Sequence, residues 1–461
     1  MGKKLGFQEI SLIMIQRAIF HFVLLTLLVA QRIDAATVLT DARIIDGTGK
    51  APLDHGAIVF DGDKITAIGP ADQIQIPQGA QVVNVQGKTI IPGLISAHSH
   101  LGLCEGALGP MPDHYNRDNV RHQLEQYERY GVLSVMALGC NKDVLYAWRE
   151  EQRHGELDGA DIFTADRGFG VYRGAPPFPL MEDQLYRPST AEEARAEVAE
   201  SASRHPDVIK LWVDDLFGTA PKMSPEVYDA IIARAHAIID EAHKRAYKVA
   251  AHMFYLSDAK ALVANGIDIL AHSVRDEPVD AELIGMMKAR GVAYIPTLEL
   301  DDSNYVFAEH PPWMEEPFFT QAVDPALLQR WRSPLYAKEM LANPNTPKNR
   351  AAAAIGQRNL KTLFDAGVKI ALGTDSGALP TRIPGFAEHW ELQLMVQSGL
   401  SPMDALVCAT KTSSEVIGAS DRGTLETGKL ADFVVLDGNP LDDIHNTTRI
   451  AMIYHHGKRV R

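Results

Sequence analysis

The sequence predicts an α/β fold in which a (β/α)8 barrel (a TIM barrel) is joined to a small β-sandwich domain formed by both chain ends. Three observations predict it. Through the middle of the 461-residue chain, eight short apolar segments alternate with longer segments of helical composition. Short segments in which apolar and polar residues alternate, separated by Asp-Gly turns, precede them, and the same pattern recurs near the C-terminus. We expect a signal peptide at residues 1–35, the first part of the sandwich at 36–91, the barrel at 92–422 and the second part of the sandwich at 423–461.

The N-terminus has the pattern of a secretory signal peptide. Three basic residues precede the apolar stretch from Ala18 to Ala30, and a short polar segment ends at Ala35 and Ala36, where cleavage is expected. The alternative is a membrane anchor, but this run is shorter than the roughly 20 residues that span a bilayer. Met14 is an alternative start. We therefore expect an exported protein, periplasmic or secreted, with no stable membrane span after signal cleavage.

Composition and charge narrow the classes of partner. Hydrophobic residues make up 46% of the chain and charged residues 23%, which is typical of a globular protein. The net charge of −14, with no basic run in the mature part, argues against a nucleic-acid partner and favours a small-molecule substrate. Three cysteines are too few for a disulfide framework. A homo-oligomer is left open.

Strands of the small domain are expected at both ends of the chain. The expected ranges are Val38–Ile45, Ala57–Phe60, Lys64–Ile68, Gly428–Leu436 and Ile450–Val460, with a turn at Asp437–Pro440. Two adjacent histidines, His455 and His456, fall in this region. Solvent-exposed or packing roles are expected for both of them.

Eight strands of the barrel are expected in chain order. They are Leu94–His98, Leu133–Leu138, Asp161–Ala165, Val208–Val213, Lys248–His252, Ile269–Ser273, Ala293–Thr297 and Lys369–Thr374. Helices between them are expected at Thr190–Arg204, Ser224–Tyr247, Val279–Arg290 and Asn349–Ala366, several of them with Ser or Thr placed as an N-cap.

The active site of such a barrel lies at the carboxyl ends of its strands, so the polar residues that end or line each apolar run are candidates for chemistry. These residues are His98, His100, Lys210, His252, His272 and Asp375. His98 and His100 are spaced i, i+2, which places both side chains on one face of a strand, where neutral imidazoles can bind one metal ion. Lys210 lies on an apolar strand, where an ammonium group is expected to lose its proton.

Each residue also has a structural interpretation. A single histidine at a strand end is commonly a hydrogen-bonded core residue. Lys210 can instead pair with Asp214 or Asp215, and Asp375 can cap the following helix. Six residues of suitable type in order at successive strands favour a metal site over these separate explanations.

The ligand pattern resembles the amidohydrolase superfamily, in its binuclear branch with a carbamylated lysine. The lead-in Ile90–His98 and the returning segment Gly428–Leu436 are also similar to that family, so the resemblance covers nearly the whole mature chain. It implies two divalent metal ions, with Zn²⁺ preferred, and a carbamate on Lys210.

The resemblance also implies a role for each residue. His98, His100 and Asp375 would hold the more buried ion, His252 and His272 the more exposed ion, and carbamylated Lys210 would bridge both together with a hydroxide. Asp375 would act as a catalytic residue, because it is placed to take the proton of the hydroxide and pass it to the leaving amine.

Four further features concern the substrate. Arg173, in the Gly- and Pro-rich loop after the third strand, and Arg275, three residues after His272, are candidate anchors for a substrate carboxylate. Tyr255 is a candidate catalytic group that hydrogen-bonds the scissile carbonyl or the leaving group, and its alternative is wall packing. The long aromatic segment from Leu300 to about Asn349 is either a lid or a loop packed on itself.

The predicted activity is hydrolysis of an amide bond, most similar to the prolidase and Xaa-dipeptide carboxypeptidase group that includes ochratoxin-type amidases. The alternatives are a hydrolase of cyclic amides, lactones or phosphotriesters, and a catalytically inactive assembly homologue. A mononuclear deaminase is less favoured, because its family pattern has Glu three residues after the strand-five histidine, where this chain has Tyr255.

Overall fold

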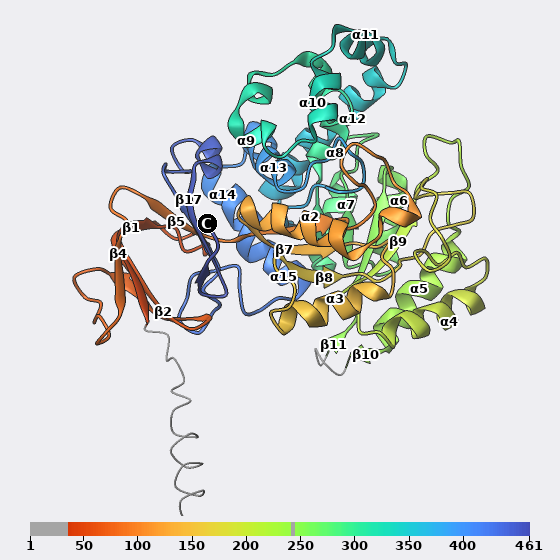
Figure 1. Cartoon of the computed structure of the whole chain (residues 1–461). Helices are drawn as coiled ribbons and strands as arrows, with labels where there is room; N and C mark the ends of the chain where they lie inside the picture. The colour runs from red at the N-terminus through yellow and green to blue at the C-terminus, as the bar shows by residue number, and fades with distance from the viewer. Residues whose placement is uncertain (1–35, 241–244) are drawn as a thin grey trace, which may run out of the picture.

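The chain adopts an α/β fold in a computed structural model that describes residues 36–240 and 245–461 (Figure 1). The predicted signal peptide, residues 1–35, lies outside the described residues. In the part of the chain that is described, no helix has both the length and the apolar character needed to cross a membrane.

Both ends of the chain contribute to one eight-stranded sheet, as the sequence predicts. Its order is β18-β17-β16-β5-β1-β2-β3, and β4 pairs with β1. The strands are β1 (Thr37–Ile44), β2 (Leu53–Asp61), β3 (Lys64–Pro70), β4 (Gln81–Asn84), β5 (Thr89–Pro92), β16 (Phe433–Leu436), β17 (Ile450–His455) and β18 (Lys458–Arg459). The antiparallel pairing of β5 with β16 joins the two ends, and Phe433 there faces Pro92. β5 ends at Pro92, and after one further residue the first strand of the next sheet begins at Leu94.

The central strands form two parallel sheets. One sheet has the order β6-β7-β8 and the other β15-β14-β13-β12-β9. Their bounds are β6 (Leu94–Ser99), β7 (Val132–Ala137), β8 (Asp161–Thr164), β9 (Ile209–Val213), β12 (Val249–Met253), β13 (Ile269–Ala271), β14 (Ala293–Ile295) and β15 (Lys369–Ile370). All eight predicted strands are present, although β15 is much shorter than expected.

Individual backbone hydrogen bonds connect the two parallel sheets at both edges. On one side, Phe169 N–H donates to the carbonyl of Lys210 in β9 at 2.8 Å. On the other, Ala97 N–H in β6 donates to the carbonyl of Leu372 at 2.8 Å, and Thr374 N–H donates to the carbonyl of His98 at 3.0 Å. These last bonds place the segment after β15 directly beside β6.

Helices cover the outside of the parallel strands (Figure 1). They are α2 (Arg117–Arg129), α3 (Val144–Arg153), α4 (Ala191–Ala202), α5 (Pro225–Ala237), α6 (Leu256–Ala264), α7 (Ala281–Arg290), α12 (Thr346–Asp365) and α13 (Phe386–Gln397). Side-chain caps start several of them, because a free backbone N–H of the first turn needs an acceptor. Thr190 accepts from Glu193 N–H at the start of α4, and Asp280 accepts from Leu283 N–H at the start of α7.

The remaining elements are short. They are η1 (Pro112–His114), β10 (Ile239–Asp240), β11 (Arg245–Ala246), α8 (Leu298–Asp302), η2 (Val306–Glu309), η3 (Pro312–Glu315), α9 (Pro317–Thr320), α10 (Pro325–Trp331), α11 (Pro334–Ala342), α14 (Pro402–Val407), the π-helical turn η4 (Cys408–Thr412), α15 (Ser413–Ile417) and η5 (Ile444–Thr448).

The segment from Leu300 to Asn349 folds into α8 to α11 at the top of the molecule in Figure 1. Its aromatic residues pack on one another: the rings of Phe307 and Trp331 stack with centroids 4.0 Å apart, and Phe319 lies edge-on to Trp313 at 5.0 Å. The packing interpretation therefore holds for these aromatic residues.

Three predicted elements are corrected. The helix predicted over Ser224–Tyr247 ends at Ala237, because Ile238 is extended and the short pair β10 and β11 follows. Gly428–Leu436 forms a strand only in β16, since Leu430 makes an isolated bridge to Lys64 before that strand begins. Ile450–Val460 is the hairpin of β17 and β18, with its turn at Gly457 (φ 70°).

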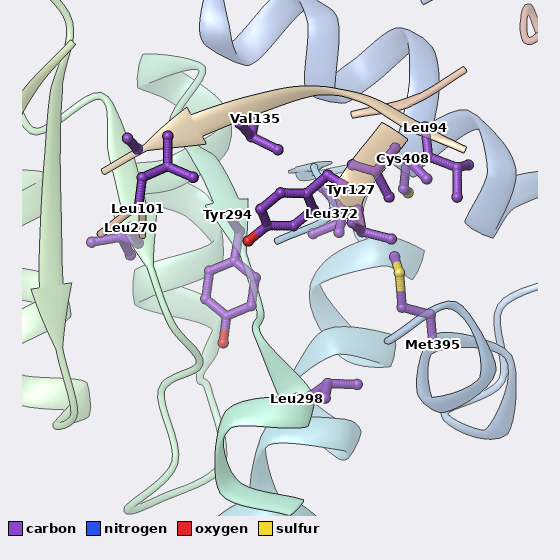
Figure 2. Close-up of a cluster of buried hydrophobic side chains, with 14 of the residues drawn as sticks. Leu94, Leu101, Tyr127, Val135, Leu270, Tyr294, Leu298, Leu372, Met395 and Cys408 are labelled. Atoms are coloured by element: carbon purple, nitrogen blue, oxygen red, sulfur yellow. The ribbon is translucent and has the colours of Figure 1, made fainter. Parts of the chain in front are cut away.

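The core lies between the parallel strands and the helices. Figure 2 shows Tyr127 of α2, Tyr294 of β14 and Met395 of α13 converging on side chains of β6 and β7, and these residues are buried. A separate buried cluster contains residues in or next to all eight parallel strands, among them Ala97, Met136, Ala250 and Ile295. Burial of each larger side chain contributes about 1.5–3 kcal/mol. The three cysteines are free and buried.

Candidate metal centre and active site

The six predicted ligands lie on or just after the strands that were expected to carry them. His98 is in β6, Lys210 in β9 and His252 in β12, whereas His272 and Asp375 follow β13 and β15. His100 comes directly after β6. Because these strands are parallel, their carboxyl ends face the same way, and the side chains meet there.

His98, His100 and Asp375 form a compact buried group. Asp375 Oδ1 lies 2.9 Å from His100 Nε2 and 3.1 Å from His98 Nε2. One ligand atom from each residue lies within 4.8 Å of the others, so the group can hold a metal ion. The group is formed by the close approach of two segments: Asp375 N–H donates to the His98 carbonyl at 2.9 Å, and His100 N–H to the Ser376 carbonyl at 2.7 Å.

The other two histidines continue this group. The ring centroids of His98 and His272 are 4.5 Å apart, and those of His272 and His252 are 4.3 Å apart. His272 contacts Thr297 Oγ1 through Nδ1 at 2.8 Å, and His252 contacts Asp214 Oδ2 through Nε2 at 2.8 Å. Four imidazoles therefore share one buried region.

Lys210 reaches this region without a hydrogen-bonding partner. Its side chain is fully buried, its Nζ makes no hydrogen bond, and Nζ lies 5.2 Å from the centre of the Trp212 ring. Neither predicted alternative partner takes it, because Asp214 contacts His252 and Asp215 accepts from the Tyr255 hydroxyl. Burial lowers the pKa of Lys210 to about 7. A lysine in this setting is readily deprotonated, which is the state that reacts with carbon dioxide.

The protonation states of the site suit metal binding. Burial lowers the pKa of His98 to about 3 and holds the pKa of His272 well below its ordinary value. Burial lowers the pKa of His252 as well, although Asp214 partly offsets it. Burial alone would raise the pKa of Asp375, but Arg382 and the two histidines hold it well below the usual range. Neutral imidazoles and an ionised carboxylate are the forms that bind metal ions.

The hydrogen-bond geometry also fits a metal. His100 Nδ1 lies 3.2 Å from the carbonyl of Gly139, which can only accept, so Nδ1 is the donor in this contact and Nε2 is the nitrogen that faces Asp375. Nε2 and the carboxylate Oδ1 are thereby both placed as ligand atoms for one cation. His98 is buried; its Nδ1 makes no hydrogen bond, and its Nε2 lies 3.1 Å from Asp375 Oδ1. Uncompensated buried polar atoms of this kind are costly, and a metal ion would satisfy them.

Backbone conformation at the site is unusual. His272, Thr297 and Asp375 have φ values of 83°, 47° and 63°, in the left-handed region that L-residues rarely adopt. Such conformations cost of order 1–3 kcal/mol each and are concentrated at functional sites, where they direct side chains. Here they direct His272 and Asp375 inward where their strands end.

A cavity of about 210 Å³ opens over the ligands. His100, His252 and Asp375 line its floor, and its walls are mainly apolar, formed by Ala175, Pro176, Pro177, Phe178, Trp212, Leu216, Phe217, Phe254 and Leu300. Arg275 and Arg382 are its cationic lining residues. Its acidic lining residues are Asp214, Asp301 and Asp375, so the cavity combines apolar walls with charged groups of both signs, a mixture that suits a small molecule.

The two predicted carboxylate anchors lie in different places. Arg275 lines the cavity, and its Nε and Nη1 make no hydrogen bond although the residue is buried; Asp301 lies 3.5 Å from Nε. Arg173 is exposed and stacks over Tyr172. Tyr255 is partly buried, and its hydroxyl donates to Asp215 Oδ1 at 2.9 Å. Of these three residues, the structure brings Arg275 alone to the cavity.

Sequence reasoning missed three supporting residues. Arg382 pairs with Asp375 Oδ2, which turns Oδ1 toward the histidines. Asp214 orients His252, and Glu388 accepts hydroxyl hydrogen bonds from the segments that carry His98 and Asp375. Asp214 had a visible signal, since it ends the β9 run. Arg382 and Glu388 had no such signal in the sequence, because a loop brings Arg382 to the site and the packing of α13 brings Glu388.

Comparisons with known proteins agree with this geometry. The family model described as "Amidohydrolase family" matches residues 89–460. A curated relative, the 5-methylthioadenosine/S-adenosylhomocysteine deaminase of Bacillus cereus (strain 03BB102), is 21% identical over 405 residues, which is 84% of this chain and 81% of the relative.

Solved structures share the fold. A Xaa-Pro dipeptidase with bound methionine superposes with a TM-score of 0.72 at 22% identity, covering 93% of this chain and 100% of that chain. The ochratoxinase of A. niger gives a TM-score of 0.68 at 20% identity, covering 93% and 96% of the two chains. Molinate hydrolase gives 0.69 at 20% identity, covering 92% and 94%.

Proposed function

The chain belongs to the amidohydrolase family, and from this premise we propose that it is a metal-dependent hydrolase that cleaves an amide bond in a small dipeptide-like or N-acyl amino acid substrate. One observation carries the proposal: Lys210 lies fully buried without a hydrogen-bonding partner, on a strand that pairs directly with the strand of His252. No simple structural role explains such a lysine, whereas a bridge between two metal ions does.

The two metal ions have natural ligands in this chain. His98, His100 and Asp375 would hold one, His252 and His272 the other, and Lys210 would join them as a carbamate. When bound, divalent ions such as Zn²⁺ would polarise the scissile carbonyl and lower the pKa of a water molecule.

The protein's own groups would manage the proton and the substrate. Asp375 reaches both the metal ligands and the cavity, so it is the proposed acceptor of the nucleophile's proton and its donor to the leaving amine. Tyr255 would assist only if its hydroxyl left Asp215 and hydrogen-bonded the substrate instead. Arg275 would bind a substrate carboxylate, and the apolar walls would exclude water from the reacting bond.

We also infer that the eight parallel strands close into a (β/α)8 barrel, with the eight-stranded sheet forming the sandwich domain beside it. The backbone bonds of Phe169 with Lys210 and of Ala97 with Leu372 support closure at both sheet edges. The buried cluster with members in or next to all eight strands supports a filled interior.

Metal counting tests the main proposal. We expect about two metal ions per chain at this site in purified wild-type protein, and a loss of metal and activity in Lys210→Ala, because the bridging group is gone. Lys288→Ala, which removes an exposed lysine of α7, is the matched control. A wild-type count that exceeds the count of Lys210→Ala by fewer than about 1.5 ions per chain would contradict the binuclear site.

A substrate screen tests the bond that is cleaved. N-acyl amino acids and dipeptides should be hydrolysed with release of the free amino acid. Activity confined to lactones, cyclic amides or phosphotriesters would favour the alternative hydrolases, and release of ammonia from 5′-methylthioadenosine would favour the deaminase activity named for the curated relatives.

We propose in addition that the protein is exported and loses residues 1–35. The basic and apolar pattern before Ala35 supports this. Expression with the full N-terminus should give a mature protein in the periplasm or medium that begins near Ala36, as read by N-terminal sequencing. A protein that retains its N-terminus in the membrane fraction would indicate an anchor instead.

A further inference from the structure

A second group of potential metal ligands lies far from the proposed active site. Asp161 begins β8, Asp432 immediately precedes β16, His455 ends β17 and His456 follows it. One ligand atom from each residue lies within 4.8 Å of the others. Asp161 is at the amino end of its strand, whereas the active-site ligands are at carboxyl ends, so the group is at the opposite end of the parallel strands, against the eight-stranded sheet.

The backbone turns two adjacent histidines to the same side. Neighbouring residues of a strand normally point in opposite directions. His456 instead has a left-handed conformation with φ 49°, and its ring stacks on that of His455 with centroids 4.3 Å apart. The conformation is unfavourable for an L-residue by roughly 1–2 kcal/mol. The two-residue turn between β17 and β18 requires a positive φ at both of its central residues, and in this turn it brings the two rings together.

Two of the four side chains, His455 and Asp432, are each held by one atom and leave a second buried atom without a hydrogen bond. His455 Nδ1 contacts Glu128 Oε1 at 2.7 Å, so it carries the proton, and the buried Nε2 makes no hydrogen bond. Asp432 Oδ1 accepts His456 N–H at 2.6 Å, and the buried Oδ2 has no partner. Asp161 Oδ2 accepts from Arg422, which leaves Oδ1 facing both rings. A carboxylate behind a histidine is the usual arrangement around a bound metal.

The spacing fits a tetrahedral ion. Asp161 Oδ1 lies 3.0 Å from His456 Nε2 and 3.7 Å from His455 Nε2. Neighbouring ligands of tetrahedral Zn²⁺ bound at 2.0–2.1 Å are roughly 3.3 Å apart. The two observed distances bracket this value.

The local charge also fits a divalent cation. Within this group the carboxylates of Asp161, Asp432 and Glu128 are accompanied by two cations, the guanidinium of Arg422 and the ring of His455. Burial alone would lower the pKa of His455, but Asp161 and Glu128 raise it to about 10. His455 is 5% exposed and Asp432 7%, so these charges lie in a poorly solvated place. A cavity of about 580 Å³ lined by Asp161, Arg422 and His456 opens beside the group, and its lining also includes Lys64, Arg153 and Lys458.

We propose that Asp161, Asp432, His455 and His456 bind a structural divalent cation, best matched by Zn²⁺, that fastens the C-terminal strands to the start of β8. On binding, the cation replaces the Nε2 proton of His455, which is released to solvent, and the Nε2 proton of neutral His456 moves to Nδ1 of the same ring. The ion would tie together three segments distant in sequence, so its main effect would be on stability, and the amide-hydrolysing site would be left unchanged.

Metal content and stability test the proposal on the full-length mature enzyme. Wild-type protein should contain three Zn²⁺ per chain after dialysis in metal-free buffer, and His456→Gln and Asp432→Asn should each contain two with kcat/KM unchanged. Lys210→Ala should retain the ion at this second site, which separates failure of this proposal from failure of the proposed function. His122→Gln, an exposed histidine of α2, is the matched control.

Two readouts do not depend on activity. Added Zn²⁺ should raise the Tm of Lys210→Ala but not that of Lys210→Ala combined with His456→Gln. In a crystal of the wild-type enzyme, anomalous scattering at the zinc edge should give a peak among the four side chains, a measurement that holds even when the variants fold poorly. No peak there with Zn²⁺ bound at the active site, or equal metal counts in wild type and both variants, would overturn the site and leave an ion-pair cluster.

Discussion

Arg275 and Arg173 are equally good anchors for a substrate carboxylate in the sequence, yet they lie in opposite environments. Arg275 is buried at the cavity with two nitrogen atoms lacking hydrogen bonds, and Arg173 is exposed. A buried guanidinium with unused donors is costly unless an anion completes it. The structure therefore separates two candidates that residue type alone could not.

Replacing each arginine by methionine tests this difference. A hydrogen bond to a charged group contributes about 1.5–3 kcal/mol, so Arg275→Met should lower kcat/KM about 10- to 100-fold for substrates with a free carboxylate. Arg173→Met should stay within about twofold of wild type. Steady-state kinetics with the matched carboxamide substrate is the control. Wild type should hydrolyse this substrate more slowly, and Arg275→Met should hydrolyse it at the wild-type rate. Equal losses of activity on both substrates would mean that Arg275 acts through folding.

The histidines, Lys210 and Asp375 could be predicted at the residue scale because strand ends are visible in the sequence, and the parallel strands bring these side chains together. Their partners could not. Asp214 was visible only as an alternative partner for Lys210, and the structure gives it to His252 instead. Arg382 reaches Asp375 across a loop, and no local pattern encodes that closure.

At the scale of elements, helix α13 organises the loops of the site through one buried carboxylate. Glu388 Oε1 accepts hydrogen bonds from the hydroxyls of Ser96 at 3.0 Å and of Thr374 and Ser376 at 2.7 Å each. Its Oε2 accepts from Gly385 N–H at 2.9 Å. Ser96 is two residues before the first ligand, and Thr374 and Ser376 flank the last one. Glu388 therefore joins the first and last segments of the site.

Glu388→Gln is expected to destabilise the fold by about 1–3 kcal/mol, because an amide accepts through one oxygen only and leaves buried hydroxyls unsatisfied. Metal affinity should fall with it, since the segments of His98 and Asp375 lose their common anchor. Urea unfolding and metal titration measure both effects. Glu282→Gln on the exposed face of α7 should change stability by less than about 0.5 kcal/mol. A Glu388→Gln protein as stable as this control would exclude the anchoring role.

Element prediction succeeded where periodicity and burial agree and failed where tertiary context decides. The parallel strands are short apolar runs between helices, so their positions were visible in the sequence. The Ala-rich segment after Ser224 has helical composition, yet α5 ends at Ala237 ahead of β10 and β11, which precede β12. The strands β4 and β5 were missed because β4 is mostly exposed and β5 continues directly toward β6. Neither strand therefore shows a recognisable strand pattern of its own in the sequence.

At the scale of the whole molecule, the two chain ends share a pattern of short strands and turns, which predicted that they form one sheet. The pairing of β5 with β16 confirms this prediction. The junction between that sheet and the parallel strands was not predictable, because it consists of single side chains that meet only after folding. His455 and His456 were expected to pack or to be exposed; His455 is buried and His456 partly exposed, and both also meet Asp161 across this junction. His389 forms another such contact.

His389 makes the stability of the molecule depend on pH. Its ring is buried between the end of α2 and η5, where Nε2 lies 2.8 Å from the Tyr130 carbonyl and Nδ1 lies 2.9 Å from Thr447 Oγ1. Burial lowers the pKa of His389 to about 4 from 6.5. Below pH 6.5 the unfolded chain therefore binds a proton that the folded chain does not. The stability from the neutral ring is complete above pH 6.5 and is lost as the pH falls toward 4, by about 3 kcal/mol in total.

Comparison of His389→Gln with wild type isolates this effect, because the metal ligands titrate alike in both proteins. Gln cannot be protonated, so the decrease in unfolding free energy between pH 7 and pH 4.5 should be about 2–3 kcal/mol smaller in the variant. Urea unfolding at the two pH values, with metal removed by a chelator, measures it. His122→Gln, which changes an exposed histidine, should keep the wild-type dependence. If His389→Gln also keeps it, then the buried ring is not the group whose protonation weakens the fold in acid.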